Sequence, residues 1–368
     1  MARYSILVRD LTGNKVGDIT DFIRLEYARK ENDIGVMTLT LPRSDLDPYI
    51  QKDLMFEIWR TVGTKTYLEG NTAWLLRKWV LSSDPNPGST KTWTLTAYDM
   101  NYVLKGYEVE YAAGDAKATK TAAIDNIMKA IVRENLGTLA TDTTRNLSTY
   151  IGVDADTTQA TSTTKAYAKR NVLAILQELA QESYQRNIYL AFDVRYVSPY
   201  YFAFGTFINQ LGVNRGRSFG NTLVVSEDRS SLIGATLTYD YTNEITVVNV
   251  GGTGRGVYRA SSQTTDADQI KYSPFSRREM FQNAVQAGSS APALDAEARA
   301  ELYKNRSVLV LTGSIQDTDA MQYGIDYNFG DIVVAEHLGY SFDAHIDTIH
   351  VTVTKEGEVL DNRIRGVK

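Results

Sequence analysis

The segment Gly35-Val36-Met37-Thr38-Leu39-Thr40-Leu41-Pro42 alternates apolar and hydroxyl side chains with a period of two residues. In an extended strand this period places Met37, Leu39 and Leu41 on one face and the threonines on the other. The segment therefore predicts a β-strand with one face in a hydrophobic core.

The same alternation recurs through the first hundred residues. It is seen at Tyr4, Ile6 and Val8, at Ile23, Leu25 and Tyr27, at Leu54, Phe56 and Ile58, and at Trp93, Leu95 and Ala97. Turn-forming residues separate the runs at Thr12-Gly13-Asn14, at Asn32-Asp33 and between Asp84 and Ser89. Short strands at this density predict a first β domain over residues 1–110, a small antiparallel barrel or sandwich.

A helical pattern follows in residues 111–186. Between Thr121 and Asn135 the apolar residues recur at helical spacing, and Gly137 is a plausible stop. A second helix begins after Asn171, a good N-cap residue, with an apolar stripe that starts at Val172. The Thr-rich stretch 138–169 between them has little periodicity and predicts a long loop. We expect these residues to form a helical insertion packed on the strands.

The remaining sequence predicts a second β domain formed by residues 187–250 and 307–368. Its expected strands include Leu190–Tyr196, Ile233–Tyr241, Ile245–Val250 and, near the C-terminus, Ala344–Val353. Residues 251–306 are expected to be an insertion with a helix from Leu294 to Arg306. Because strands and helices do not alternate regularly, a parallel α/β fold is disfavoured. The predicted fold class is mainly β, with two antiparallel β-barrel domains and helical insertions.

Composition limits the function. The 368 residues are 43% hydrophobic and 23% charged, with a net charge of −5 and a pI near 5.4. This acidic balance argues against specific nucleic acid binding through neutralisation of phosphates. There is no cysteine, no signal sequence, and no apolar run near the roughly 18 residues of a membrane span. We expect a soluble protein made in a cytoplasm.

Two glycine-containing turns attract attention as candidate sites. The run Gly251-Gly252-Thr253-Gly254-Arg255-Gly256 lacks the spacing of a dinucleotide fingerprint and the Gly-Lys-Ser/Thr of a phosphate loop. We therefore expect no cofactor and interpret Gly251, Gly252, Gly254 and Gly256 as a tight turn or bulge. Gly330 and Asp331 are likewise interpreted as a structural turn.

Catalytic and metal-binding patterns are weak. His345 and His350 are five residues apart in an expected strand, so they should point to opposite faces unless a bulge intervenes. Asp154, Asp156 and Thr158 suggest a calcium loop but lack its glycine and final glutamate. No G-x-S-x-G elbow occurs, and no carboxylate pair stands out. We expect no catalytic residues, no metal and no enzymatic activity.

Tyrosine is abundant, with 23 residues, and aromatic side chains crowd one region. This region contains Tyr196, Tyr200, Tyr201, Phe202 and Phe204. Core and cross-strand packing is the favoured interpretation, followed by a protein interface and then by carbohydrate binding.

Several segments, in order along the chain, resemble a family of tail proteins from long-tailed, non-contractile phages. These are Val8-Arg9-Asp10-Leu11-Thr12-Gly13, 23–27, 35–42, Phe56-Glu57-Ile58-Trp59-Arg60, 125–135, 247–256 and Tyr323-Gly324-Ile325-Asp326-Tyr327-Asn328-Phe329-Gly330-Asp331. The family looks related to the baseplate hub of contractile phages. Residues 138–169 and 205–221 match none of its motifs.

The resemblance implies a homotrimer in which two β-barrels per subunit form a six-unit ring. Such a ring would continue the hexameric tail tube, convert it to threefold symmetry, and leave a channel for genome ejection. The implied partners are distal tail and tail tube proteins, the tape-measure protein, and tip fibre or receptor-binding proteins. The implied location is the virion tail tip, after assembly in the host cytoplasm. The alternatives are a carbohydrate- or receptor-binding module of a virion and, less favoured, a hydrolase.

Overall fold

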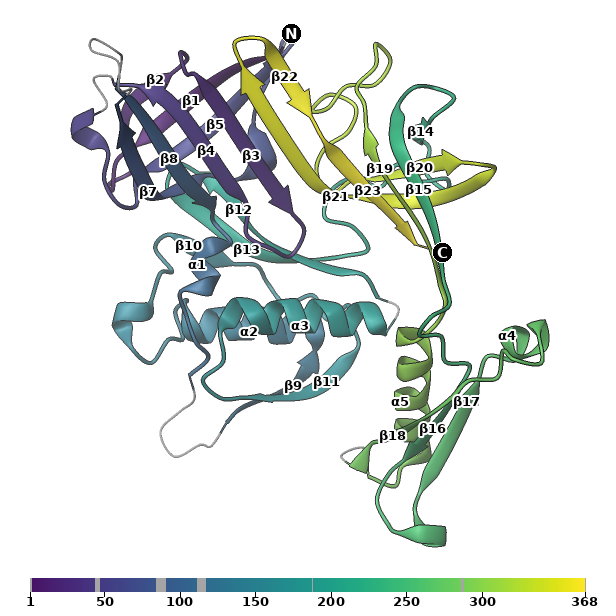
Figure 1. Ribbon diagram of the computed structural model, residues 1–368. Helices are drawn as coiled ribbons and strands as arrows, with labels where there is room; N and C mark the ends of the chain where they lie inside the picture. The colour runs from purple at the N-terminus through teal and green to yellow at the C-terminus, as the bar shows by residue number, and fades with distance from the viewer. Residues whose placement is uncertain are drawn as a thin grey trace.

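The computed structural model describes residues 2–43, 47–83, 91–110, 117–186, 188–285 and 288–367. The protein is mainly β, and its elements form two β modules side by side, a middle module with two long helices beneath them, and a small arm (Figure 1). The turn expected at residues 84–89 lies outside the described residues.

The first β module confirms the alternating pattern that predicted it. Its side chains at Met37, Leu39 and Leu41 are buried, while the threonines between them are partly exposed. Neighbouring strands pair in the order β3-β4-β8-β7-β5-β1-β2, and β6 pairs with β5. The strands are β1 (Arg3–Arg9), β2 (Lys15–Ile19), β3 (Arg24–Lys30), β4 (Val36–Pro42), β5 (Met55–Val62), β6 (Lys65–Leu68), β7 (Trp74–Ser82) and β8 (Thr92–Asp99).

The second β module continues the same hydrogen-bonded sheet. Its long strand β21 pairs with β23, β20 and β22, and also with β3 of the first module. One core cluster runs through both modules. The strands are β14 (Val224–Ser226), β15 (Leu232–Asp240), β19 (Val308–Ile315), β20 (Ile332–His337), β21 (Tyr340–Thr354), β22 (Gly357–Leu360) and β23 (Asn362–Val367).

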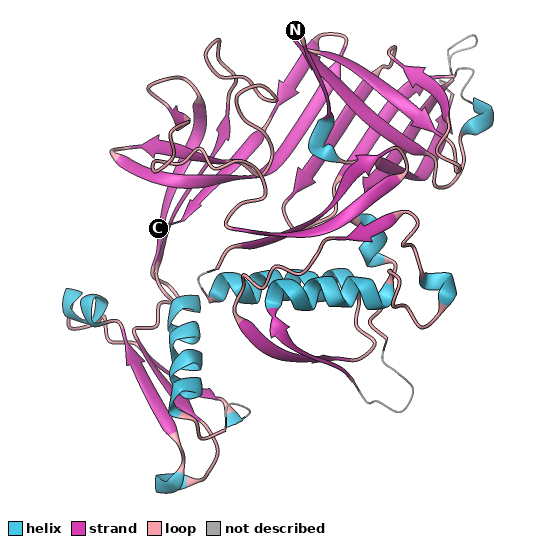
Figure 2. Ribbon diagram, turned by 180° about the vertical axis from the view of Figure 1, so that it is seen from behind, coloured by secondary structure: helices cyan, strands magenta, loops and turns pink. Residues whose placement is uncertain are grey.

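The two β modules therefore form one continuous sheet. The strands β2 and β15 stand at the two ends of its main path. The sheet curves around the shared core, as the view from behind shows (Figure 2). The mainly β class is confirmed, whereas the closed form of two barrels stays a prediction.

A β-bulge in β21 decides the side on which its histidines lie. The ladder with β23 shifts register between Ile346 and Thr348, and the buried positions change there from even to odd residue numbers. His345 and His350 therefore both lie on the side of the strand away from the core. The sequence predicts that the two histidines point to opposite faces of the strand unless a bulge intervenes. A bulge does intervene, so the prediction of opposite faces is wrong.

The middle module confirms both predicted helices. The side-chain oxygen of Asn171 accepts a hydrogen bond from the backbone N–H of Ala174 at 3.3 Å, as an N-cap does. The apolar stripes of the two helices pack on strands β12 and β13. The elements are α1 (Tyr102–Lys105), β9 (Ala118–Ala123), α2 (Ile124–Asn135), β10 (Ile151–Val153), β11 (Ser162–Tyr167), α3 (Val172–Gln185), β12 (Leu190–Ser198) and β13 (Tyr201–Ile208).

Two details of this module differ from the sequence-based expectation. Strands β12 and β13 form a separate sheet in the order β10-β13-β12 and bury Phe192 and Phe204 against the helices, so they do not extend the second β module as expected. The stretch 138–169 is not one long loop, because it contains β10, β11 and a 3-10 turn. Polar side chains of α2 hold it, since Asp125 accepts hydrogen bonds from the backbone of Gln159 and Ala160.

The arm, defined here as residues 241–307, is inserted between the paired strands β15 and β19. It contains a three-stranded sheet in the order β17-β16-β18, covered on one face by α5. Its elements are β16 (Val247–Gly251), β17 (Ser261–Thr265), α4 (Ala267–Tyr272), β18 (Glu279–Asn283) and α5 (Ala291–Lys304). The predicted helix is present, but β16 belongs to the arm and not to the second β module.

A buried ion-pair cluster joins the first β module to the middle module. The guanidinium of Arg29 lies 3.2 Å from Asp99 Oδ2 and 2.6 Å from Asp193 Oδ1, and all three side chains are buried. Burial raises the pKa of the Asp99 carboxyl to about 6, although Arg29 opposes this shift. Arg29 therefore compensates two carboxylates that come from different modules.

Replacing Arg29 by methionine leaves two buried carboxylates without their cation. We expect Arg29→Met to lower the free energy of unfolding by about 3–5 kcal/mol, the usual cost of breaking a buried pair from one side. Arg24→Met on the same strand is the control, because the Arg24–Glu26 pair is exposed and contributes less than about 1 kcal/mol. Urea unfolding of both variants measures the difference, and equal losses would contradict the assignment.

Candidate interaction surfaces

A second polar cluster joins the two β modules. The Arg60 side chain is 2% exposed and places Nη2 2.6 Å from Glu358 Oε1 of β22. Its Nη1 donates hydrogen bonds to the hydroxyl of Tyr67 and to the carbonyl of Tyr323, each at 2.6 Å. The Tyr323 hydroxyl donates to Glu69, and burial raises the pKa of the Glu69 carboxyl. These contacts hold the modules together and leave no exposed reactive group at this place.

The turn at Gly330 and Asp331 organises a segment that is distant in sequence. Asp331 Oδ1 accepts a hydrogen bond from the backbone N–H of Val213 at 2.6 Å, and Oδ2 lies 3.2 Å from Arg215 Nε. Gly330 has φ +82°, and a Cβ there would approach the side chain of Leu211. The Val213–Arg215 part of the stretch 205–221 is thus attached to this turn.

The run from Gly251 to Gly256 lies in the arm, at the end of β16. Gly254 and Gly256 have φ values of +101° and +55°, which favour glycine. Gly252 has ordinary backbone angles, but a Cβ there would overlap the carbonyl oxygen of Gly288. This turn and the Gly330–Asp331 turn belong to different modules, and the structure does not bring them together (Figure 1).

The three histidines and the carboxylates of the suggested calcium loop are separated; His345 Nδ1 is buried without a hydrogen-bond partner, and the others are paired. Nδ1 of His337 lies 2.8 Å from Glu227, and Nε2 of His350 lies 3.0 Å from Glu26. The calcium-loop carboxylates are bound by arginines: Asp154 lies 2.5 Å from Arg195, and Asp156 lies 2.8 Å from Arg133. In the described ranges, no three His, Cys, Asp or Glu side chains are grouped as metal ligands would be.

The crowded aromatic residues of β12 and β13 are mostly part of the core. Phe202 and Phe204 are buried against the helices of the middle module. The Tyr196 hydroxyl donates a hydrogen bond to Glu57 at 3.1 Å, and Tyr200 packs edge-on against Tyr150. The structure does not gather these rings into an exposed groove.

Large apolar side chains are exposed on the arm instead. Val257, Tyr258, Tyr272 and Phe275 are 86–93% exposed. Exposed residues of this size are typical of protein contact sites when they gather into a patch. None of the described helices is long and apolar enough to cross a membrane.

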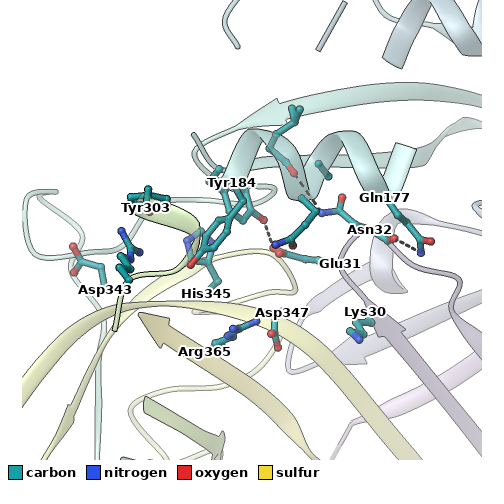
Figure 3. A pocket seen from close by; sticks show the side chains of 15 residues that line it. Lys30, Glu31, Asn32, Gln177, Tyr184, Tyr303, Asp343, His345, Asp347 and Arg365 are labelled. Carbon is teal, nitrogen blue, oxygen red and sulfur yellow. Dashed lines mark hydrogen bonds between the residues drawn. The ribbon is translucent and has the colours of Figure 1, made fainter. Parts of the chain in front are cut away.

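A cavity of about 450 Å³ lies where both β modules, the middle module and the arm meet. We call it the junction cavity. Figure 3 shows that its lining side chains converge from several elements. It is lined by Lys30, Glu31, Asn32, Gln177, Ala180, Gln181, Tyr184, Tyr189, Leu190, Tyr303, Arg306, Asp343, His345, Asp347 and Arg365.

Two titratable groups of the junction cavity have pKa values that are shifted in opposite directions. Burial raises the pKa of the Glu31 carboxyl to about 7, although the Tyr189 hydroxyl donates a hydrogen bond to it. Burial lowers the pKa of His345 to about 4, and its ring stacks on Tyr189 with 4.4 Å between centroids. The sequence analysis missed this site, because its residues are scattered and form no local motif.

The chain was compared with protein families, with curated protein sequences and with solved structures. The family described as "Siphovirus ReqiPepy6 Gp37-like protein" matches residues 5–368. No curated protein sequence matches the chain.

Three solved structures have a similar fold. The 43 kDa tail protein of prophage MuSo2 from Shewanella oneidensis has a TM-score of 0.58 and 11% identity, over 99% of this chain and 97% of its own. A tail protein from Neisseria meningitidis MC58 has a TM-score of 0.57 and 10% identity, over 99% and 96%. Prophage tail protein gp18 from Listeria monocytogenes EGD-e has a TM-score of 0.54 and 13% identity, over 99% and 94%. At these identities the likeness concerns the fold.

Adding one methyl group at Gly252 tests the glycine turn. We expect Gly252→Ala to displace the Gly288 backbone and to unfold the arm sheet, since the methyl group has no free space. Hydrogen exchange should show lost protection in β16, β17 and β18, with the main sheet unchanged because its core is separate. Gly256→Ala is the matched control, since a Cβ there meets nothing and costs only about 1–2 kcal/mol of backbone strain. Equal exchange in the two variants would refute a packing role for Gly252.

The raised pKa of Glu31 predicts a pH-dependent stability difference. Folding favours the protonated carboxyl, so this group destabilises the native state progressively as pH rises from about 4.5 to about 7. We expect the free energy of unfolding of Glu31→Gln to exceed that of the wild type by an amount that grows across this pH window to about 3 kcal/mol. Below the window the two proteins should differ little. Urea unfolding as a function of pH measures the difference. Glu356→Gln, at an exposed position, is the control, and a pH-independent difference for Glu31→Gln would exclude the assignment.

Proposed function

The chain belongs to the Siphovirus ReqiPepy6 Gp37-like protein family, and from this premise we propose that it forms the hub at the distal end of a phage tail tube. It is a structural protein of the virion tail. In the proposal three subunits form a ring that joins the hexameric tube to a threefold tip. The channel of this ring lets the genome leave.

One observation carries the proposal. The pairing of β21 with β3 makes the two β modules of each subunit a single unit with one core. Three such units present six β modules in a fixed arrangement, which is what a junction between sixfold and threefold symmetry needs. The similarity in fold to two tail proteins extends over 99% of the chain and supports a role in the tail.

The proposed contacts follow from the edges of the sheet. Among the described strands, β2 and β15 stand at the two ends of the main path and have unpaired backbone groups on one side. Such edges are normally covered, and in a ring the neighbouring subunit covers them. The further partners in this proposal are distal tail and tail tube proteins, the tape-measure protein, and tip fibre or receptor-binding proteins. The subunits assemble in the host cytoplasm and remain at the virion tail tip.

The second candidate is a carbohydrate- or receptor-binding module. The exposed rings of Tyr258, Tyr272 and Phe275 on the arm favour it, because aromatic side chains with free faces bind sugars and proteins. It predicts that the isolated chain binds cell-wall glycans. Glycan binding by the monomer, without any ring, would favour this candidate over the hub.

Imaging of intact particles tests the hub directly. We expect a threefold ring of this chain at the distal end of the tail tube, with channel-facing residues that are mostly acidic or neutral. Such a surface would let nucleic acid pass without binding it. Cryo-electron microscopy of particles shows where the ring lies and which residues line its channel. Light scattering of the purified chain measures its oligomeric state.

The control for this prediction is a particle whose copy of the gene lacks β21. Without that strand the two β modules lose their shared sheet, so the ring should be absent from tail tips. A ring of basic residues lining the channel, or one copy of the chain per tip, would refute the hub.

A further inference from the structure

The arm is attached to the rest of the chain at one place. Strands β15 and β19 are antiparallel neighbours, with Asp240 opposite Val308, and the arm begins and ends there. The two connections are therefore adjacent and act as a single pivot. Figure 1 shows the arm extending away from the sheet below this point. We refer to all described residues outside 241–307 as the body.

The arm has its own small core. Val248, Val250, Leu294 and Ala298 are buried together, between the arm sheet and α5. The partly buried side chains packed on this core also come from the arm, and none comes from the body. The arm can therefore change its position as a unit without exposing its core.

Few specific contacts hold the arm against the body. The rings of Tyr184 on α3 and Tyr303 on α5 meet edge-on, with 6.5 Å between centroids. Apart from the pivot, no hydrogen bond or ion pair connects arm and body among the residues that the structure describes. An aromatic pair contributes about 0.5–1.5 kcal/mol, too little to fix the arm in one position.

The surfaces that face each other beside this ring contact are joined by no ion pair in the part of the chain that the structure describes. A groove of about 330 Å³ between α3 and α5 is lined by Glu178 and Glu182 of the body and by Glu297 and Glu301 of the arm. The basic residues nearby bind within the body, since Lys165 and Arg186 both pair with Glu182. Acidic groups on both sides are also paired within their own part, Glu178 with Arg170 at 2.6 Å and Glu301 with Lys304 at 3.7 Å, so the groove supplies no ion pair that holds the arm against α3.

The pivot itself contains an unsatisfied buried group. Glu244 is 8% exposed, and its Oε1 atom has no hydrogen-bond partner. It lines a cavity of about 240 Å³ together with Arg299 and Arg306. An unpaired buried polar atom costs about 1–3 kcal/mol.

We propose that the arm is hinged and takes more than one position relative to the body. The hinge consists of residues 241–245 and 305–307, and among the described residues no ion pair across the α3–α5 groove ties the arm to α3. Because Tyr303 and Arg306 form one wall of the junction cavity, arm movement opens and closes that cavity. This inference does not depend on the hub function, since it concerns a single chain.

The absence of cysteine allows a direct test in the full-length protein. Spin labels on Ala174→Cys in α3 and Ala296→Cys in α5, both exposed positions, report the distance between body and arm by pulsed electron paramagnetic resonance. A control pair, Ala174→Cys with Val359→Cys, lies within the body. Dilution with unlabelled chain removes distances between subunits. We expect a broader distance distribution for the body–arm pair than for the control, while hydrogen exchange shows that β16 and β17 stay folded.

A charge reversal tests the mechanism. Glu297→Lys places a cation opposite Glu178 and Glu182, so the body–arm distribution should narrow and shift to shorter distances. Asp268→Lys makes the same change of charge on α4, away from the groove, and should leave the distribution unchanged. A body–arm distribution as narrow as the control would overturn the hinge. The same shift in both charge variants would overturn the role of the groove.

Discussion

The pairing of β21 with β3 is the interaction on which the rest of the structure depends. From Thr348 opposite Lys30 to Thr354 opposite Arg24, it joins the two ends of the chain in one ladder. Closing so long a loop costs conformational entropy, which the backbone hydrogen bonds and the shared core must offset. Tyr27, Ile349 and Val351 are buried in that core, so the ladder and the packing support each other.

Buried ion pairs fix the orientation of the modules relative to one another. Arg29 and Arg60 both start from strands of the first β module, but one reaches Asp193 of the middle module and the other reaches Glu358 of the second β module. Desolvation cancels much of the energy of such pairs, whereas a misplaced partner leaves an uncompensated charge. The pairs therefore disfavour other relative orientations of the modules more than they add to total stability.

Local features of the fold could be predicted from the sequence, and long-range features could not. The alternation at Met37, Leu39 and Leu41 and the cap at Asn171 depend on neighbouring residues, and the structure confirms both. The attachment of residues 138–169 depends on Asp125, and the bulge in β21 depends on ladders with distant strands, so neither leaves a local signal. The junction cavity was missed for the same reason, because its lining comes from several elements that meet only in the folded chain.

The arm differs from the body in its connections. Within the body, each module is joined to the next by a strand ladder, by a shared core or by buried ion pairs, and each of these requires a defined geometry. The arm has a strand ladder at its point of attachment only, and no ion pair joins it to α3 among the described residues. Closed symmetry requires contact surfaces at fixed angles, and the body can supply them. A part that must reach partners of different shape is better placed on a pivot, because its movement then leaves the angles between the body surfaces unchanged.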